Sequence, residues 1–299
     1  MTEAWLILGA GSIGGLWAAR LYQAGRSPQL LLREDAFANY GGLHIEGEKT
    51  VAVPAISPAG LTQPINNLLV CCKSYQTLDA LTPLVPHFHE NTALVLVQNG
   101  MGIAEQIKAR YPSIHLYCGA TTAGANRSAR FSIRPAGRGE TLIGSFDDSA
   151  TQAIAIANSL SCPGFPVTAS DNILPLLWRK LAINCAINPL TVRYRCRNGE
   201  LLDLPAACRD LKAICEEFTA VSQALGREHW VPNLLDTVTD VALKTAANRS
   251  SMLQDVEAGR RTEIDAITGY LCREAQRLAI ATPVNQSLLD EIVSTHSPR

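Results

Sequence analysis

Residues 4–21 read AWLILGAGSIGGLWAARL, and this segment predicts the fold of the first part of the chain. A short apolar run at 4–8 is followed by the pattern G-x-G-x-x-G and then by an alanine-rich segment. In a dinucleotide-binding βαβ unit, the first glycine allows a tight turn, the second lets the backbone approach a pyrophosphate, and the third lets the helix pack on the strand. The order of strand, glycine loop and helix therefore predicts such a unit. Its phosphate-binding residues are expected to be Gly9, Ala10, Gly11, Ser12, Ile13 and Gly14.

A second strand is predicted at 29–32, and the residues that follow it indicate which dinucleotide binds. A site for NAD usually places an acidic residue about 20 positions beyond the glycines, where it bonds the ribose hydroxyls. Here the strand ends at Arg33, which is followed by Glu34 and Asp35. An arginine can pair with a 2′-phosphate and stack on adenine, and this favours NADP(H). The alternative is a surface Arg33 with Glu34 on the ribose.

The rest of the first half alternates strands and helices. Strands are expected at 65–72, 92–97 and 114–119, with a helix at 74–84 and a hairpin at 131–143 that closes the first domain. Lys73, Asn99 and a small-residue loop at 120–125 follow the three strands. Ligands bind beyond the carboxyl ends of parallel strands, so these residues are expected to contact cofactor and substrate. Each of them could instead serve only as a turn residue.

Residues 178–190, WRKLAINCAINPL, carry a second informative pattern. Lys180, Asn184 and Asn188 are four residues apart, so on a helix they share one face. Apart from Arg179 and this polar stripe, the predicted helix is almost entirely apolar. The stripe is either a narrow solvated edge or a row of polar groups facing a buried cleft. Burying a lysine that has no task is costly, and this favours the second interpretation.

From about residue 171 onward the pattern is helical throughout, with long amphipathic stretches at 206–225 and 251–279. Ser251 is expected to cap the last helix, with Gln254 completing a capping box.

Within that expected helix, Glu263 falls on the same side as Val256 and Ile267, and Gly259 leaves room one turn earlier. Because the neighbouring residues on this side of the helix are apolar, we interpret the Glu263 carboxylate as functional. The alternative is a structural ion pair of Glu263 with Arg260 or with another helix.

Composition limits the function classes. The 299 residues suffice for two domains, and a net charge of -1 lacks the basic excess of nucleic-acid-binding proteins. No apolar window approaches the roughly 18 residues of a membrane span, and the chain opens directly into its first strand, so neither a membrane span nor a signal peptide is expected. The nine cysteines include no C-x-x-C pair, and His87 and His89 belong to a loop rather than a cluster. We therefore expect no metal site, and a cytoplasmic location.

Taken together, these motifs resemble the ketopantoate reductase (2-dehydropantoate 2-reductase) family. The matching segments run in the family's order from residue 4 to about 285: GAGSIGG, the strand-end Lys73, VQNGMG, WRKLAINCAINPLT, NGEL from Asn198, SMLQD and RRTEID. The glycine loop is generic, whereas the lysine helix and the SMLQD and TEID pair are specific to this family and its close relatives. The resemblance implies an NADP-binding Rossmann domain at 1–170 and an all-helical substrate domain at 171–299. It also implies NADPH-dependent reduction of 2-dehydropantoate to (R)-pantoate in pantothenate biosynthesis.

By motif position, the resemblance implies that Lys180 is the general acid. The residues implied on the substrate side are Asn99, Lys180, Asn184, Asn188, Asn198 and Ser251. Those implied on the cofactor side are the glycine loop from Gly9 to Gly14, Arg33, Lys73, Asn99, Ala125 and Glu263.

Two other functions remain open at this point. One is an NADP-linked dehydrogenase of the same build that acts on another 2-oxo acid or a sugar acid. The other is a non-catalytic NADPH-binding regulator, which the presence of Lys180, Asn184 and Glu263 disfavours. The expected partner is a small-molecule 2-oxo acid rather than a nucleic acid or a membrane, and the chain is expected to be a monomer or a homodimer.

Overall fold

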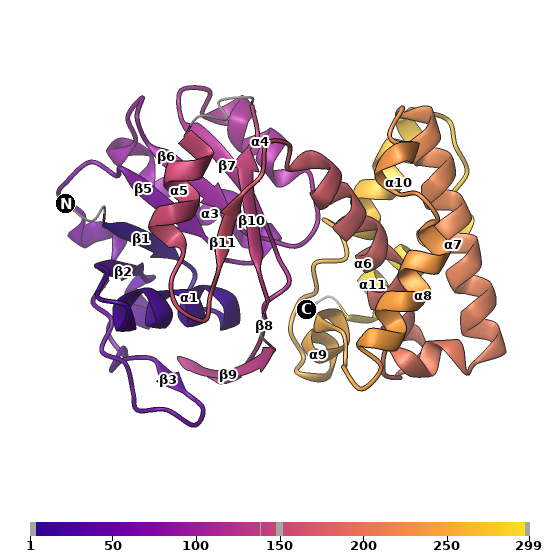
Figure 1. Cartoon of the computed structure of the whole chain (residues 1–299), viewed down its shortest axis with the longest axis horizontal. Helices are drawn as coiled ribbons and strands as arrows, with labels where there is room; N and C mark the ends of the chain where they lie inside the picture. The colour runs from indigo at the N-terminus through magenta and orange to yellow at the C-terminus, as the bar shows by residue number, and fades with distance from the viewer. Residues whose placement is uncertain (1–3, 138, 148–151, 297–299) are drawn as a thin grey trace. The chain divides into compact units, whose positions relative to one another are not determined.

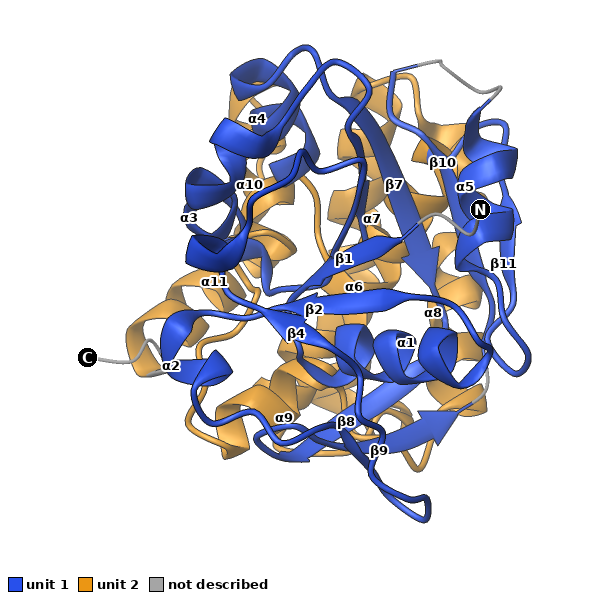
Figure 2. Ribbon diagram, turned by 90° about the vertical axis from the view of Figure 1, so that its left-hand side faces the viewer, with its two compact units in different colours: residues 1–98, 103–173 blue, residues 99–102, 174–299 orange. Residues whose placement is uncertain are grey.

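The computed structural model describes residues 4–137, 139–147 and 152–296. The chain divides into two compact units (Figure 2). Unit 1 comprises residues 1–98 and 103–173, and unit 2 comprises residues 99–102 and 174–299. Each unit has its own hydrophobic core.

Unit 1 alternates strands and helices along the chain (Figure 1). Its strands are β1 (Trp5–Leu8), β2 (Pro28–Leu31), β3 (His44–Ile45), β4 (Ala55–Ile56), β5 (Asn67–Val70), β6 (Ala93–Leu96), β7 (His115–Thr121), β8 (Gly124–Ala129), β9 (Ser132–Gly137), β10 (Thr141–Ser145) and β11 (Val167–Ala169). Its α-helices are α1 (Ser12–Gln23), α2 (Glu34–Phe37), α3 (Thr77–Leu81), α4 (Ile103–Arg110) and α5 (Ala153–Leu160). Short 3₁₀ turns are η1 (Pro58–Gly60), η2 (Ser74–Gln76) and η3 (Thr82–His87).

The main sheet of unit 1 has eight strands in the order β11-β10-β7-β6-β5-β1-β2-β4. The six strands from β4 to β7 are mutually parallel, and β10 runs antiparallel to β7. The parallel part has the strand order of a doubly wound dinucleotide-binding fold. From β1 the chain adds β2 and β4 on one side, and it then adds β5, β6 and β7 on the other side, so the strand order reverses between β1 and β5. The predicted α/β class is therefore confirmed. A separate sheet has the order β3-β9-β8.

The carboxyl ends of four central strands are in register. Leu8, the last residue of β1, pairs with Leu31 of β2 and with Val70 of β5, and Val70 pairs with Leu96 of β6. The loops that follow these strands therefore leave the sheet along one edge, at the point where ligands bind in such folds.

Helices cover both faces of the sheet, with α1 and α5 on one side and α3 and α4 on the other (Figure 2). Trp17 connects α1 with the end of α5. Its indole Nε1 donates to the Leu160 carbonyl at 3.2 Å, and its ring centroid lies 5.0 Å from that of Phe165. A sheet covered on both faces needs strands that are apolar throughout, and β5 and β6 are buried at every position.

Unit 2 is helical apart from its turns, as the sequence predicts. Its helices are α6 (Leu174–Tyr194), α7 (Pro205–Ala224), α8 (Leu234–Lys244), α9 (Ser251–Glu257), α10 (Thr268–Arg277) and α11 (Pro283–His296), with 3₁₀ turns η5 (Gly199–Leu202) and η6 (Glu228–Trp230). Helix α6 contacts α7, α8, α9 and α11. A helix surrounded in this way is buried on most sides, which explains why residues 178–190 are apolar around nearly the whole circumference. In the described part of the chain, no helix combines the length and the apolar character that a membrane crossing requires.

The single helix expected at 251–279 is wrong, because α9 ends at Glu257 and α10 begins only at Thr268. Gly259 has φ +63°, the left-handed conformation that ends many helices. The Gly259 N–H bonds the Val256 carbonyl at 3.0 Å and the Arg260 N–H bonds the Asp255 carbonyl at 2.8 Å, which together form a Schellman motif. Gly259 therefore terminates the helix instead of leaving room beside Glu263, and Glu263 lies in the following turn.

The expected cap at Ser251 is also wrong by one residue. Ser250 has extended backbone, and its Oγ accepts the Leu253 N–H at 3.0 Å, whereas Ser251 is already helical. The side chain of Gln254 bonds the Arg249 carbonyl instead of completing a capping box.

Three expectations in unit 1 need smaller corrections. The loop expected at 120–125 is mostly strand, because β7 continues to Thr121 and β8 begins at Gly124. The hairpin lies at 124–137 and is formed by β8 and β9, while β10 returns to the main sheet beside β7. The helix expected at 74–84 is divided into η2, α3 and η3, with Pro83 and Pro86 inside the last turn.

Candidate functional site

The glycine loop after β1 has the geometry that a phosphate site needs. Gly9 has φ +106°, and a Cβ there would lie 2.6 Å from the Cys72 nitrogen. A Cβ on Gly14 would lie 2.1 Å from the Gly9 carbonyl oxygen, so the start of α1 packs directly on the turn. Gly11, by contrast, has no atom within 4 Å of its Cβ position. Its missing side chain leaves open space in front of the helix.

The N-terminus of α1 complements this open space. Gly11 provides no side-chain cap, and the first turn contains no acidic residue. The N–H groups of the first turn have no partner within the helix and carry the positive end of its dipole. The loop and the helix start therefore fit the anionic pyrophosphate of a dinucleotide.

Two basic residues lie on unit 1 beyond the same edge of the sheet. Arg33 caps α2 by its backbone, and its side chain is 81% exposed, with Nε 3.8 Å from the Asp35 carboxylate. Asp35 also binds Arg130 at 2.9 Å, and these cations lower the pKa of its carboxyl group. Lys73 is partly buried and precedes η2. Both positions suit contacts to the acidic parts of a nucleotide.

Lys180 and Glu263 form the central pair of unit 2. Lys180 lies on α6 and is partly buried, and Glu263 is 6% exposed. Burial lowers the pKa of the Lys180 ammonium to about 8, and the negative charge of Glu263 partly opposes that shift. A lysine with such a pKa can hold and release a proton near neutral pH.

Asn99 joins this pair although it is distant in sequence. Its Nδ2 donates to Glu263 Oε2 at 3.3 Å. The segment 99–102 is fixed beside the Glu263 turn, because the Met101 N–H bonds the Ala266 carbonyl at 2.9 Å. Gly100 has φ +84°, and a Cβ there would lie 2.3 Å from the Ala266 oxygen. Only glycine permits this close approach.

The remaining members of the α6 stripe extend away from Lys180. Asn184 is half-buried and Asn188 is 6% exposed. A chain of buried hydroxyl groups continues from there: Thr191 Oγ1 donates to the Asn188 carbonyl at 2.8 Å and lies 2.6 Å from Ser250 Oγ. This chain fixes the start of α9 against α6, next to the end of the stripe.

Three further predicted site residues, Ser251, Asn198 and Ala125, have the following surroundings. Ser251 is exposed at the first position of α9. Asn198 is 8% exposed, and its Nδ2 donates to Thr245 Oγ1 at 2.9 Å, while its Oδ1 is buried without a hydrogen-bond partner among the described residues. Ala125 lies in β8, opposite Pro135 in the small sheet of unit 1.

Sequence reasoning missed several polar contacts around these residues. Arg260, expected as an alternative partner of Glu263, binds Asp255 instead, with Nε 2.9 Å from Oδ1. The hydroxyl chain of Thr191 and Ser250 was also missed. The sequence signal for Ser250 is a serine directly before an apolar helical pattern, and the adjacent Ser251 fits that signal equally well.

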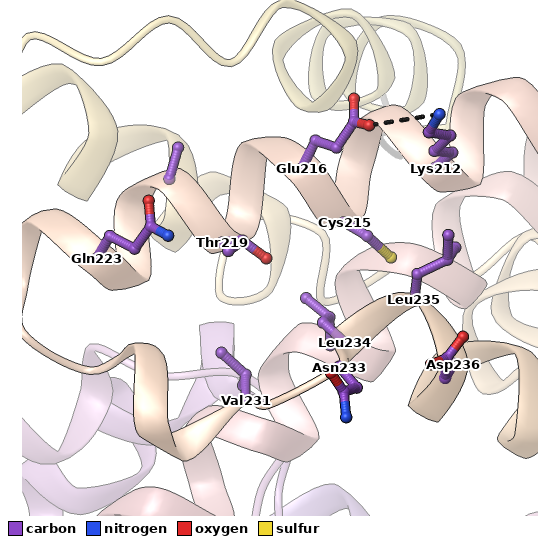
Figure 3. A pocket seen from close by; sticks show the side chains of 11 residues that line it. Lys212, Cys215, Glu216, Thr219, Gln223, Val231, Asn233, Leu234, Leu235 and Asp236 are labelled. Atoms are coloured by element: carbon purple, nitrogen blue, oxygen red, sulfur yellow. Dashed lines mark ion pairs between the residues drawn. The ribbon is translucent and has the colours of Figure 1, made fainter.

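Unit 2 also contains a cavity. It has a volume of about 410 Å³ and lies between α7 and α8, with Cys215, Val231 and Leu234 among its lining residues (Figure 3). At its rim Lys212 and Glu216 pair with each other at 3.8 Å. Burial raises the pKa of the Cys215 thiol to about 12, so this group is not a thiolate. The cavity contains none of the predicted site residues.

Among residues 4–137, 139–147 and 152–296, no group of three or more His, Cys, Asp or Glu side chains could hold a metal ion.

Comparison with known proteins gives a consistent result. The family described as ketopantoate reductase PanE/ApbA matches residues 5–148, and the C-terminal part of the same family matches residues 172–294. The chain is similar to the 2-dehydropantoate 2-reductase of Vibrio cholerae, with 36% identity over 296 residues that cover 96% of each protein. It is similar in structure to a PanE/ApbA family ketopantoate reductase from Ralstonia eutropha, with 26% identity, 97% coverage of each chain and a TM-score of 0.84. It also shares its fold with a D-mandelate dehydrogenase solved with NADH and anilino(oxo)acetate, at 23% identity, 98% coverage of each chain and a TM-score of 0.89.

Proposed function

The chain belongs to the ketopantoate reductase family, and from this membership we propose that it reduces 2-dehydropantoate to (R)-pantoate with NADPH. It is an NADP-dependent oxidoreductase whose product serves pantothenate and coenzyme A biosynthesis. The observation that carries the proposal within the structure is the group of Lys180, Glu263 and Asn99 in unit 2. This group supplies a proton donor and polar contacts of the kind that reduction of a 2-oxo acid requires.

The cofactor residues that we propose are those of the glycine loop, together with Arg33, Lys73, Asn99, Ala125 and Glu263. When bound, NADPH supplies the hydride. The open space at Gly11 and the uncapped start of α1 support a pyrophosphate contact. The exposed guanidinium of Arg33 supports a contact with the 2′-phosphate.

We propose that Lys180 donates the proton to the ketone oxygen. Negative charge develops on that oxygen as the carbonyl is reduced, and an ammonium group stabilises it before transferring the proton. Glu263 contributes a negative charge that favours the protonated form of Lys180. We assign Asn99, Asn184, Asn188, Asn198 and Ser251 to the polar groups of the substrate, because amides and hydroxyls can bind a hydroxyl or a carboxylate without adding charge.

We further propose residues 1–170 as the NADP-binding domain and residues 171–299 as the substrate and catalytic domain. The nine cysteines carry thiols rather than disulfides, which supports a reducing, cytoplasmic environment. We propose that the chain acts as a monomer or a homodimer on a small-molecule 2-oxo acid.

A panel of 2-oxo acids, assayed by the loss of NADPH absorbance, tests the proposal. We expect the highest kcat/KM with 2-dehydropantoate. A markedly higher kcat/KM with another 2-oxo acid or a sugar acid would assign the chain to a different dehydrogenase activity. Tight NADPH binding without turnover of any substrate would instead indicate a regulator.

A further inference from the structure

The backbone on either side of Lys73 is held by side chains that the proposed function does not use. Lys73 follows β5, has φ −62° and ψ 144°, and precedes η2. Two peptide carbonyls flank its Cα, that of Cys72 before it and its own after it. The direction of the Lys73 side chain depends on the orientation of these two peptide planes.

Gln98, which lies just beyond the end of β6, holds the first of these carbonyls. Its Nε2 donates to the Cys72 carbonyl oxygen at 2.8 Å and also to Thr77 Oγ1. Thr77 is fully buried, and its hydroxyl donates in turn to the Lys73 carbonyl oxygen at 3.2 Å. Gln98 and Thr77 therefore hold both carbonyls that flank Lys73.

The orientation of the Gln98 amide follows from its partners. A carbonyl oxygen can only accept a hydrogen bond, so the NH₂ group must face the Cys72 carbonyl. The Gln98 Oε1 atom is consequently turned away, and it is buried without a hydrogen-bond partner among the described residues. An unpartnered buried acceptor is unfavourable, and an apolar side chain would avoid that penalty. We therefore infer that Gln98 is needed at this position as a hydrogen-bond donor.

The peptide that precedes Cys72 is held separately, by the glycine loop. A Cβ at Gly9 would lie 2.6 Å from the Cys72 nitrogen and 2.9 Å from the Cys71 carbonyl carbon. The close packing of Gly9 therefore fixes the peptide between Cys71 and Cys72, whereas Gln98 acts on the next peptide, between Cys72 and Lys73.

We propose that Gln98 is a positioning residue for the dinucleotide: through the Cys72 carbonyl and Thr77 it fixes the peptide planes around Lys73 and directs the Lys73 ammonium toward the anionic part of the cofactor. This inference rests on the proposed NADPH-dependent function. Gln98 itself is not required to touch the cofactor.

The test measures the dissociation constant of NADPH directly, by fluorescence titration, for Gln98→Leu, Lys73→Met and the double variant. We expect about a tenfold weakening for Lys73→Met and about a three- to tenfold weakening for Gln98→Leu. The double variant should bind no more weakly than Lys73→Met alone, because a residue that acts only through Lys73 has nothing left to position.

Substitutions at Thr77 provide a second series with a matched control. Thr77→Val removes the hydroxyl at nearly constant shape and should weaken NADPH binding, whereas Thr77→Ser keeps the hydroxyl and should bind like the parent. Thr82 makes the same type of bond one turn later, with Oγ1 3.0 Å from the Leu78 carbonyl, but does not contact Lys73. Thr82→Val should therefore leave NADPH affinity unchanged.

Additive effects of Gln98→Leu and Lys73→Met would overturn the inference, as would a lower melting temperature of Gln98→Leu with unchanged NADPH affinity. Both of those results leave NADPH binding by the parent intact. Failure of the parent itself to bind NADPH would instead overturn the proposed function, and the inference with it.

Discussion

At the scale of single residues, Lys180 carries the chemistry that we propose. It is the only lysine of α6, and burial brings the pKa of its ammonium to about 8. Lys180→Met keeps a similar length and an apolar stem but removes the charge and the proton. We expect kcat to fall by about 10²–10⁴-fold while NADPH affinity stays near that of the parent. Steady-state kinetics and NADPH titration check this, and a kcat close to the parent's would require another proton donor.

The pH dependence of the reaction should report the coupling between Lys180 and Glu263. A general acid must be protonated, so kcat/KM should fall as the pH rises through about 8. Glu263 raises the pKa of Lys180 by its charge, and Glu263→Gln removes that charge at nearly constant shape. The alkaline limb of the profile should therefore move to lower pH in Glu263→Gln. An unshifted limb with a lower melting temperature would show that Glu263 only stabilises the fold.

The lowered pKa of Lys180 also makes the free energy of unfolding depend on pH. Between about pH 8 and the usual lysine pKa of 10.5, the unfolded chain holds a proton on Lys180 that the folded chain has lost. The unfolded state therefore binds more protons, and the contribution of Lys180 to the free energy of unfolding rises with pH in this window.

Arg33 determines cofactor preference in our proposal. Its guanidinium is exposed after β2, where a site for NAD would carry an acid. Arg33→Ala should weaken NADPH binding by about tenfold to a hundredfold, because a charge-assisted contact with the 2′-phosphate is lost. NADH affinity should hardly change. Titrations of both cofactors against the parent and the variant check this, and equal affinities of the parent for NADPH and NADH would refute it.

At the scale of elements, the sequence predicts well those helices and strands whose pattern is local. Helices α6 and α7 lie within a few residues of the predicted ranges, because unbroken helical spacing marks them. The last predicted helix is wrong because its apolar spacing continues across Gly259, where left-handed backbone and two hydrogen bonds end α9. The spacing of Val256, Glu263 and Ile267 matched a helix by coincidence, and only the cap geometry decides the boundary.

The neighbouring serines at the start of α9 offer a matched pair of variants. Ser250 is buried and caps the helix, whereas Ser251 is exposed. Ser250→Ala should reduce the free energy of unfolding by about 0.5–2 kcal/mol through loss of the cap. Ser251→Ala should leave stability nearly unchanged and raise the KM for the 2-oxo acid. Denaturant unfolding and steady-state kinetics check both variants, and the reverse assignment of effects would show that Ser251 is structural.

Some of the site residues can be predicted from a local sequence pattern, whereas others are brought together only by the tertiary fold. Lys180, Asn184 and Asn188 could be grouped from sequence because they share a helix and its period. The bond between Asn99 and Glu263 joins residues 164 positions apart, and no periodicity reports it. Thr77 could not be found either, because its role depends on a hydrogen bond from Gln98, which follows a different strand of the sheet.

At the scale of the whole molecule, the two units have separate cores and distinct proposed tasks. Trp17, Leu69 and Val95 belong to the core of unit 1, and Trp178, Phe218 and Leu271 belong to that of unit 2. The segment 99–102 belongs to unit 2 by its contacts although it follows β6 in sequence. The close approach of Gly100 to Ala266 explains why this segment belongs to unit 2. Nothing in the sequence of the four residues themselves predicts that approach.

Hydrogen exchange followed by mass spectrometry can locate the dinucleotide on this architecture without any substitution. NADPH should slow amide exchange at the glycine loop and the first turn of α1, and around Arg33 and Lys73, because those backbone segments lose solvent access or mobility when the ligand binds. Peptides from α7 and α8 should exchange at the same rate with and without NADPH, and they serve as the internal control. The 410 Å³ cavity between those two helices is large enough for part of a ligand. The experiment therefore distinguishes binding at the glycine loop from binding in this cavity. Protection centred on 205–244, with exchange at the glycine loop unchanged, would move the cofactor to that cavity and leave Gly11 and the start of α1 without their proposed role.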